Sequence, residues 1–374
     1  MKKAGKNLTK KTSEAISRDT LDRKSSPVPP ALLGDLQALI ESARVRVAIG
    51  VNSEMVLLYW DIGERIRKEI LKDERAAYGK QVLDTLSGEL VTQYGPGFTR
   101  TNLFNMVRFA EIFPDRTIIH SLSGQLSWTH FRNLIYVDDS LAREFYTEMC
   151  RLERWSVRTL QAKIQGMLFE RTALSKKPEE LARKELAALR EEDRMTPDLV
   201  FRSPYFLEFL GLSDTFSEKD LENSILRELE LFILELGTDF SFIARQKRIT
   251  VDAEDYYIDL LFYHRKLRRL VAIDLKLGKF KAADKGQMEL YLRWLDKYDR
   301  QPGEEPPIGL ILCAGSSVGH IELLELEASS IRVAEYLTEL PPREVLEQKL
   351  KAAVTNARER LAERGKKGEM RDGK

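Results

Sequence analysis

Two short apolar runs, Tyr257-Ile-Asp-Leu-Leu-Phe262 and Val271-Ala-Ile-Asp-Leu-Lys-Leu277, decide the fold of this chain. Each run is typical of a β-strand, and each carries charge within an otherwise hydrophobic stretch. Charged side chains in such surroundings are costly unless they are paired or bind a ligand. A short turn centred near Lys266 and Leu267 separates the runs, which predicts an antiparallel hairpin.

The register of this hairpin brings two aspartates together. With Lys266 and Leu267 as turn residues, Asp259 lies opposite Asp274, with Cβ atoms about 5 Å apart. Lys276 shares the face of Asp274, because side chains two residues apart in a strand point the same way. A register slip of one residue would separate these side chains. An exposed salt bridge would explain Lys276 with one aspartate, but not two facing carboxylates.

Facing carboxylates destabilise a sheet unless something compensates for their charge. A divalent cation does so, since hard cations prefer oxygen ligands. Two aspartates beside a lysine suit metal-assisted hydrolysis of a phosphodiester: the carboxylates hold Mg²⁺, and the metal polarises the phosphate and activates a water molecule. The lysine orients that water or stabilises the developing negative charge. His264, in the turn, is expected to be a surface residue.

The segments around the hairpin predict an α/β domain with a mixed sheet flanked by helices. A helix is expected to follow Ser217, with Asp220 completing a capping box, and to run to about Leu236 before Gly237. Three strands are expected next, at 240–250, 256–263 and 270–277. A helix at 285–299 and a buried strand at 307–313 follow them.

The front of the chain is predicted to be mostly helical. Helices expected at 79–94 and 99–113, separated by Gly95-Pro96-Gly97, outline a helix-turn-helix. The second helix opens with Thr99, a potential cap, and Arg100, Thr101 and Asn102, whose side chains suit phosphates or base edges. An ordinary antiparallel helix pair explains the same pattern. Five regions are predicted: a disordered basic arm (1–30), the helical domain (31–171), a solvated charged connecting helix (172–195), the α/β domain (196–345), and an exposed helix with a basic tail (346–374).

Composition excludes several classes of protein. The 374 residues suit two or three domains. No run of 18 apolar residues and no apolar segment behind the basic start are present, so we expect a cytoplasmic protein with no membrane contact. Two cysteines are too few for a disulfide framework, and buried thiols are expected. The net charge of +1 conceals basic ends and a basic segment, 240–300, with 14 Lys/Arg against 9 Asp/Glu, which would attract phosphates.

The motifs of the hairpin resemble a known class of nucleases. Asp259 with Asp274-x-Lys276 resembles the PD-(D/E)XK motif, and Gln287-x-x-x-Tyr291 resembles a motif of RecB-like nucleases. An ordinary core stripe also explains the second pair, since Gln287 and Tyr291 share a helix face. Members of this class also carry a metal-binding glutamate on the helix before the first strand. Three glutamates compete for this role, and the first is favoured: Glu222, Glu228 and Glu230.

A wider resemblance covers roughly residues 32–345. Segments 234–248, 259–264, 285–294 and 306–313 are similar to the YhcG-like family of bacterial nucleases, and 51–63 is similar to that family's helical leading domain. The resemblance implies a restriction-endonuclease-like core, a winged-helix-like leading domain, dependence on Mg²⁺ or Mn²⁺, and a nucleic-acid substrate. DNA is expected, although the resemblance does not decide between DNA and RNA. It also suggests a homodimer.

The resulting hypothesis is a Mg²⁺-dependent nuclease with Asp259, Asp274 and Lys276 at its centre. Three basic residues that flank the site in sequence are candidates for phosphate contacts, and so is one on the first turn of the helix expected at 99–113: Arg245, Lys247, Lys279 and Arg100. The alternative is a nucleic-acid-binding or assembly module that keeps the nuclease fold without turnover. A metal-independent scaffold would require the facing aspartates to be accidental.

Overall fold

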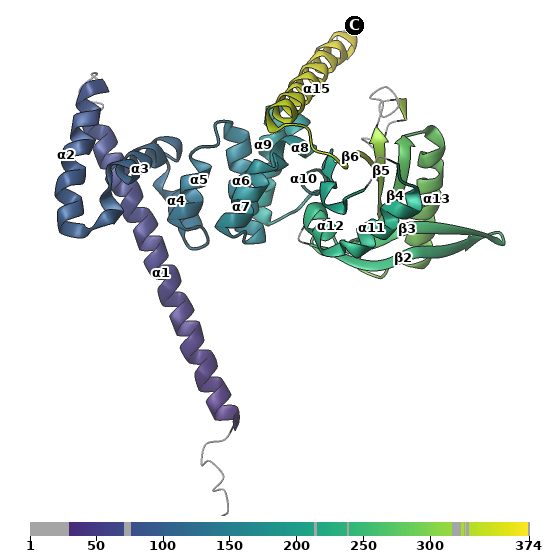
Figure 1. Cartoon of the computed structure of the whole chain (residues 1–374), viewed down its shortest axis with the longest axis horizontal. Helices are drawn as coiled ribbons and strands as arrows, with labels where there is room; N and C mark the ends of the chain where they lie inside the picture. Colours follow the sequence, from purple (N-terminus) through teal and green to yellow (C-terminus); the bar gives the residue numbers. More distant parts are fainter. Residues whose placement is uncertain are drawn as a thin grey trace, which may run out of the picture. The chain divides into compact units, whose positions relative to one another are not determined.

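The computed structural model describes residues 30–70, 76–212, 215–237, 239–315, 323–324, 326 and 329–372 (Figure 1). The chain divides into two compact units, 1–51 and 52–374. The described part of the first unit is the opening stretch of α1 (Pro30–Ile70), which continues into the second unit. The expected disordered arm lies outside the described residues, apart from Pro30. Of the helices that are described, none is both long and apolar enough to cross a membrane.

The second unit begins with a helical region. Its elements after α1 are α2 (Ala76–Tyr94), η1 (Pro96–Phe98), α3 (Arg100–Ile112), α4 (Arg116–Ser123), α5 (Trp128–Leu134), α6 (Ser140–Glu153), α7 (Val157–Gln165), α8 (Leu168–Arg171), η2 (Leu174–Lys176), α9 (Glu179–Glu192) and α10 (Pro197–Val200). Buried Val56 and Trp60 join α1 to the aromatic core around Phe109 and Phe131. No strand occurs before Tyr205 in the described residues, which therefore contain no wing of a winged helix.

The predicted helix pair around Gly95-Pro96-Gly97 is present as α2 and α3. Thr99 occupies the N-cap position of α3, but its side chain makes no capping hydrogen bond. Asn102 is used within the fold, because its amide donates to the Gly97 carbonyl at 2.5 Å and its oxygen accepts from Trp128 Nε1 at 3.0 Å. An asparagine engaged in this way holds the turn between the two helices rather than facing a ligand.

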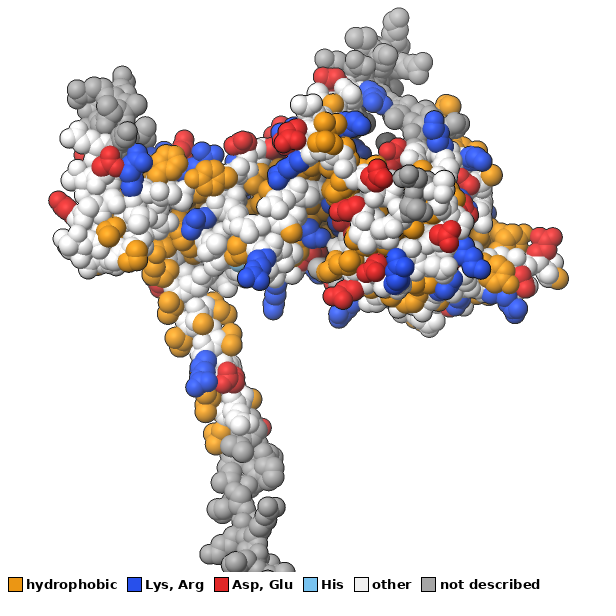
Figure 2. All heavy atoms as spheres, in the orientation of Figure 1, with side chains coloured by type: hydrophobic (Ala, Val, Ile, Leu, Met, Phe, Trp, Pro, Cys, Tyr) orange, Lys and Arg blue, Asp and Glu red, His pale blue; other side chains and the backbone are white. Residues whose placement is uncertain are grey.

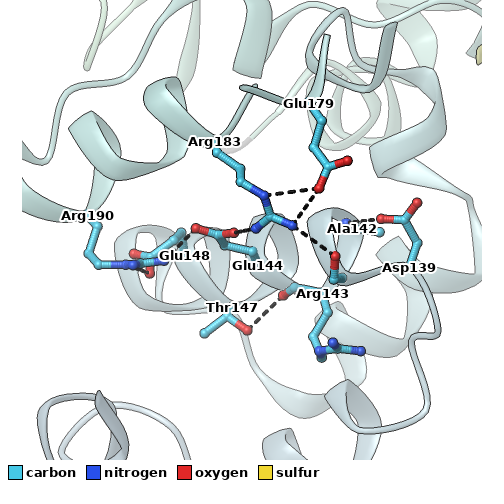
Figure 3. Close-up of polar contacts among 10 residues, drawn as sticks. Asp139, Ala142, Arg143, Glu144, Thr147, Glu148, Glu179, Arg183 and Arg190 are labelled. Atoms are coloured by element: carbon cyan, nitrogen blue, oxygen red, sulfur yellow. Dashed lines mark hydrogen bonds and ion pairs between the residues drawn. The ribbon is translucent and has the colours of Figure 1, made fainter. Parts of the chain in front are cut away.

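The charged segment expected to be a solvated connecting helix is packed on one side. Helix α9 buries Ala182, Leu186 and Leu189. Its arginines form ion pairs with acidic side chains of α6 (Figure 3). Arg183 and Arg190 both pair with Glu144, at 3.0 and 2.7 Å. The expected solvated helix is therefore solvated on one face only. The segment is highly charged, but Ala182, Leu186 and Leu189 recur at helical spacing and are enough to bury one face of α9.

A six-stranded mixed sheet forms the second half of the chain, in the order β1-β6-β5-β4-β3-β2. Its strands are β1 (Tyr205–Phe206), β2 (Phe240–Val251), β3 (Glu254–His264), β4 (Arg269–Lys279), β5 (Ile308–Gly315) and β6 (Ile331–Leu337). Strands β2, β3 and β4 are antiparallel, whereas β4, β5, β6 and β1 run parallel. The predicted mixed sheet is confirmed. Six of the eight residues of β5 are buried, as its unbroken apolar run predicts.

Helices cover both faces of this sheet. Helix α13 (Ala282–Tyr298) packs Met288 and Tyr291 with Ala272 in one core, and Gly309 of β5 admits Met288 because a Cβ at this position would clash with that side chain. On the other face, α11 (Glu218–Arg227) and α12 (Leu229–Leu236) pack against Val271 and Ile273. The remaining elements are η3 (Glu208–Leu210) and α15 (Arg343–Asp372).

The helix predicted after Ser217 is divided in two. Ser217 and Asp220 form the predicted capping box, and Gly237 ends α12 with a φ of 140°. Glu228 interrupts the helical path with a φ of −106° and a ψ of 33°. The expectation of one continuous helix is therefore wrong. The two shorter helices present separate apolar faces to the same side of the sheet, a tertiary arrangement that local periodicity does not reveal.

Candidate active site

The hairpin of β3 and β4 has the predicted register. Leu260 pairs with Ile273, and pairing continues to His264 and Arg269 next to the turn. One step further from the turn, the strands separate at the two aspartates. Here the Asp259 carboxylate takes the place of a backbone partner, since its Oδ2 accepts a hydrogen bond of 2.8 Å from the backbone N–H of Leu275. Asp259 is thereby fixed against β4.

Asp274 and Lys276 lie side by side on β4, as their spacing predicts. Lys276 Nζ is 2.9 Å from Asp274 Oδ2, yet this buried oxygen has no aligned hydrogen bond among the described residues. Asp274 is only 2% exposed, and burial raises its pKa to about 6 against the attraction of Lys276, with repulsion from Asp259 adding to the rise. Burial works to lower the pKa of Lys276, but attraction to Asp274 outweighs it and the pKa is raised.

Glu222 is the helix glutamate that the fold brings to this cluster. It is buried on α11, and Gln246 joins it to Asp259: the Gln246 amide donates to Glu222 Oε2 and to Asp259 Oδ1, each at 3.0 Å. Of the two competing residues, Glu228 lies at the break between α11 and α12, and Glu230 is exposed. Burial raises the pKa of Asp259, although the Leu275 N–H and the Gln246 amide oppose this rise.

Gln246 is a site residue that sequence reasoning missed. Its neighbours Arg245 and Lys247 pair with Leu260 and Ile258, so Gln246 lies opposite Asp259 on the next strand. Its φ of 45° is in the left-handed region, which is unusual for a residue with a side chain. No local pattern distinguishes Gln246 from the charged residues on either side of it. Aligning β2 with β3 in antiparallel register would have revealed its position.

Gln287 and Tyr291 connect α13 to β3. Gln287 Nε2 donates to the Tyr291 hydroxyl at 2.5 Å, and that hydroxyl donates to the Tyr257 carbonyl at 2.9 Å. Tyr257 precedes Asp259 by two residues on β3. Burial raises the pKa of Tyr291, which keeps its hydroxyl protonated as a donor. Gln287 and Tyr291 contact each other and β3, and these hydrogen bonds fix the position of β3 relative to α13.

The four candidate phosphate contacts differ in their present partners. Arg245 pairs with Glu222 at 2.5 Å. The other engaged cations pair outside the cluster: Lys247 with Asp299 at 3.1 Å and Arg100 with Asp84 at 2.6 Å. Lys279 is exposed at the end of β4. Arg245 is thus the cation among the four that touches the acidic cluster directly.

His264 is not the surface residue that its turn position suggested. It is 3% exposed, and its Nδ1 accepts a hydrogen bond of 3.1 Å from the backbone N–H of Leu267. Its ring packs edge-on against Phe240 at 4.7 Å, and burial lowers its pKa to about 4. A neutral histidine in this setting holds the hairpin turn closed. Both cysteines, Cys150 and Cys313, are buried and free, as expected.

The acidic cluster is suited to a metal that keeps part of its water shell. Within the described ranges, no group of three or more His, Cys, Asp or Glu side chains is gathered closely enough to form a complete cage. Mg²⁺, however, is commonly held by one or two carboxylates, with water and phosphate oxygens as its other ligands. Asp274 Oδ2, buried and without an aligned donor, is a fitting ligand for such an ion, with Asp259 beside it.

Comparison with known proteins identifies two matching regions. Residues 35–171 match the family model described as the DUF1016 N-terminal domain, and residues 198–351 match the YhcG PDDEXK nuclease domain. The chain is similar to the protein named "Putative nuclease YhcG" of Escherichia coli (strain K12). The two are 35% identical over 344 residues, which cover 83% of this chain and 91% of that protein.

Two solved structures are distantly similar to part of the chain. A repair endonuclease from Pyrococcus abyssi is 21% identical with a TM-score of 0.24, and EndoMS in apo form is 17% identical with a TM-score of 0.23. Each match covers 35% of this chain and about half of the other, 50% and 49%. At these scores the likeness says nothing further about this chain.

Proposed function

The chain belongs to the YhcG family of PDDEXK nucleases, and from this premise we propose that it hydrolyses DNA phosphodiester bonds in a reaction that depends on Mg²⁺ or Mn²⁺. The observation that carries the proposal is the state of Asp274. This carboxylate is buried beside Lys276 and Asp259, and its Oδ2 has no aligned hydrogen bond in the described structure. Because Asp259 adds a second negative charge beside Asp274, a bound cation would offset the repulsion between the two carboxylates.

Asp259 and Asp274 are the residues that would hold the metal. When bound there, the ion would polarise the scissile phosphate and lower the pKa of a water molecule. Asp259 is already oriented for this role, because the Leu275 N–H and the Gln246 amide fix its two oxygens. Asp274 has an oxygen to offer. Burial is the main cause of the raised pKa of both carboxyls, and a bound cation would offset this cost because it favours their charged forms.

Lys276 is proposed to act on the reacting phosphate. Its ammonium group lies 2.9 Å from Asp274, and its raised pKa keeps it protonated at neutral pH. A cation in this place stabilises negative charge that develops on a phosphate oxygen, and it can orient the attacking water. With a metal held by Asp274, Lys276 would be free to turn toward the substrate, because both side chains project from the same face of β4.

Glu222 and Gln246 are proposed to position the first aspartate. The amide of Gln246 donates to both carboxylates, and this arrangement keeps two acids close without requiring that either be protonated. Supporting hydrogen bonds of this kind orient metal-binding carboxylates. Glu222 would complete the set of carboxylates around the metal, and Gln287 with Tyr291 would set the position of β3.

Contacts with the DNA backbone are proposed for the cations around the cluster. Arg245 is exposed, Lys247 is half-buried, and both hold acidic partners, so each would exchange a carboxylate for a phosphate. Lys279 is exposed at the end of the strand that carries Asp274. Arg100, on the first turn of α3, is a candidate for a separate contact made by the helical region. All four contacts would weaken as salt concentration rises.

The proposal is tested with a panel of linear, circular and branched DNA and of RNA, with and without Mg²⁺ or Mn²⁺. Metal-dependent cleavage of DNA that is lost in Lys276→Ala is expected. Lys184→Ala is a matched control, because this exposed lysine of α9 lies outside the proposed site and its loss should leave cleavage intact. Absence of cleavage under every condition, or equal activity of Lys276→Ala and the wild type, would refute the proposal. Salt-dependent binding without cleavage would instead support a nucleic-acid-binding module.

A further inference from the structure

The opening stretch of α1 exposes more apolar surface than a solitary helix sustains. All side chains from Asp35 to Val51 are exposed, and Figure 2 shows apolar groups along this part of the helix. Seven of them are large and between 44 and 66% exposed: Leu36, Leu39, Ile40, Val45, Val47, Ile49 and Val51. A helix of this length is marginal in water without packing, and an apolar patch of this extent marks an interaction surface.

The spacing of these residues defines one seam. Leu36, Ile40, Ala43 and Val47, called the α1 seam here, follow one another at intervals of four, three and four residues. That alternation is the a/d pattern of a coiled coil, in which each seam side chain inserts between side chains of a facing helix. The seam therefore predicts a helical occupant of matching length. At 1.5 Å per residue, its span is about 17 Å.

Charge and side-chain size indicate that the facing helix is a second α1 in antiparallel orientation. The acidic residues Asp35 and Glu41 precede the midpoint of the exposed stretch, and the basic residues Arg44 and Arg46 follow it. Antiparallel pairing places acidic halves against basic halves, whereas parallel pairing would place like charges together. The helix dipoles also favour the antiparallel arrangement.

The same pairing gives complementary layers in the seam. With the two-fold axis between Glu41 and Ser42, Ile40 faces Ala43 of the second copy, and Leu36 faces Val47. Each layer then combines a larger with a smaller side chain, which is how facing positions fill space without voids or overlap. An isologous contact of this kind closes on itself and yields a dimer rather than a filament.

We propose that the protein forms a homodimer through antiparallel pairing of the α1 seam. This inference is independent of the proposed catalytic activity. The seam is short, so the interface belongs to the small class, and the dimer should dissociate on dilution. A dimer of this form carries two copies of the Asp259–Asp274 cluster in one particle.

The oligomeric state of the full-length protein tests the proposal. Light scattering after gel filtration, together with sedimentation over a wide range of concentration, should give a monomer–dimer equilibrium. Ile40→Glu should leave only monomer. Val45→Glu is the matched control, because Val45 is equally exposed but lies on the opposite side of the helix from Leu36. Since Ile40 is exposed in the monomer, circular dichroism and the melting temperature should show an intact fold in both variants.

Cysteine cross-linking tests the orientation. A mixture of Leu36→Cys and Val47→Cys proteins should form a disulfide-linked dimer, whereas Leu36→Cys alone should not, because antiparallel pairing separates its two copies by about 17 Å along the axis. The native cysteines are buried and should not interfere. A monomer at every concentration, a dimer unaffected by Ile40→Glu, or self-linking of Leu36→Cys would each overturn the proposal. A monomer would show that another segment or another protein covers the seam.

Discussion

Two clusters of charged side chains in this protein are built in opposite ways. The α6–α9 network contains Glu144 and Glu148 of α6 with Arg183 and Arg190 of α9 (Figure 3). The buried Glu148 pairs with Arg190 at 2.8 Å and with Arg151 at 2.9 Å. The β3–β4 cluster contains Asp259, Asp274 and Lys276, with Glu222 nearby.

The difference between them separates a structural use of charge from a reactive one. Every acid of the α6–α9 network meets guanidinium groups, and the pairs join two helices. In the β3–β4 cluster three acids, Asp259, Asp274 and Glu222, share two cations, Lys276 and Arg245. Among the described residues Asp274 Oδ2 has no aligned hydrogen bond, and burial raises the pKa of Asp274 to about 6. A balanced network contributes to stability, whereas an unbalanced one lowers stability and remains ready to bind a ligand.

The largest expected effect comes from neutralising the unbalanced cluster. Asp274→Asn should lower the cleavage rate about 10³-fold, because it removes a metal ligand and the charge that positions Lys276. The melting temperature should not fall, since a neutral amide is less costly to bury than a carboxylate. Cleavage kinetics and thermal unfolding of the same preparations provide the measurement. A variant with full activity would remove Asp274 from the proposed mechanism.

Breaking the balanced network should have the reverse effect. Glu148→Ala should lower the free energy of unfolding by about 3 kcal/mol, because it leaves Arg151 and Arg190 without their buried partner. Cleavage per folded molecule should stay unchanged. Denaturant titration measures the loss. Glu192→Ala is the control, since this exposed residue of α9 should change stability by less than about 0.5 kcal/mol.

The dependence of stability on pH should distinguish the two clusters further. Burial raises the folded-state pKa of Asp274 from 3.8 to about 6, so the fold favours the protonated carboxyl. Relative to Asp274→Asn, the wild type should therefore be most stable below about pH 4 and lose roughly 3 kcal/mol as the pH rises through 6. Unfolding of both proteins between these values measures the difference. A constant difference would contradict the buried, unbalanced state of this carboxyl.

Two substitutions of Gln246 should separate positioning from simple structural support. Both Gln246→Ala and Gln246→Gly remove the amide that joins Glu222 to Asp259, and each should reduce cleavage about 10- to 100-fold. The glycine variant should be the more stable by about 1 kcal/mol, because glycine adopts a φ of 45° without strain. If the amide only supported the fold, activity would follow stability, and the glycine variant would be clearly the more active.

The smallest effect is expected at the link between α13 and β3. Tyr291→Phe removes the hydrogen bond to the Tyr257 carbonyl, which is worth about 1 kcal/mol, so cleavage should fall about fivefold. Tyr298→Phe is the control, because Tyr298 lies exposed at the end of the same helix. Steady-state kinetics of the two variants measure the effect. A loss as large as that of Asp274→Asn would indicate that Tyr291 takes part in the reaction itself.

The elements next to the hairpin were predictable because their signals are local. The turn at Lys266 and Leu267 fixed the register of β3 and β4, and alternation placed Asp274 and Lys276 on one face. The unbroken apolar run of β5 predicted burial on both faces. Signals that depend on distant partners were missed: the break at Glu228, the packed face of α9, and the burial of His264.

Sequence by itself determined that this protein has a mixed α/β domain with two aspartates and a lysine gathered on one hairpin, because strand period and turn position depend only on neighbouring residues. Tertiary structure alone decided which glutamate joins them and how. Glu222 reaches Asp259 through Gln246, and these three residues come from α11, β2 and β3. Their meeting depends on how the helix packs on the sheet and on one left-handed residue in β2, and no local pattern encodes either feature.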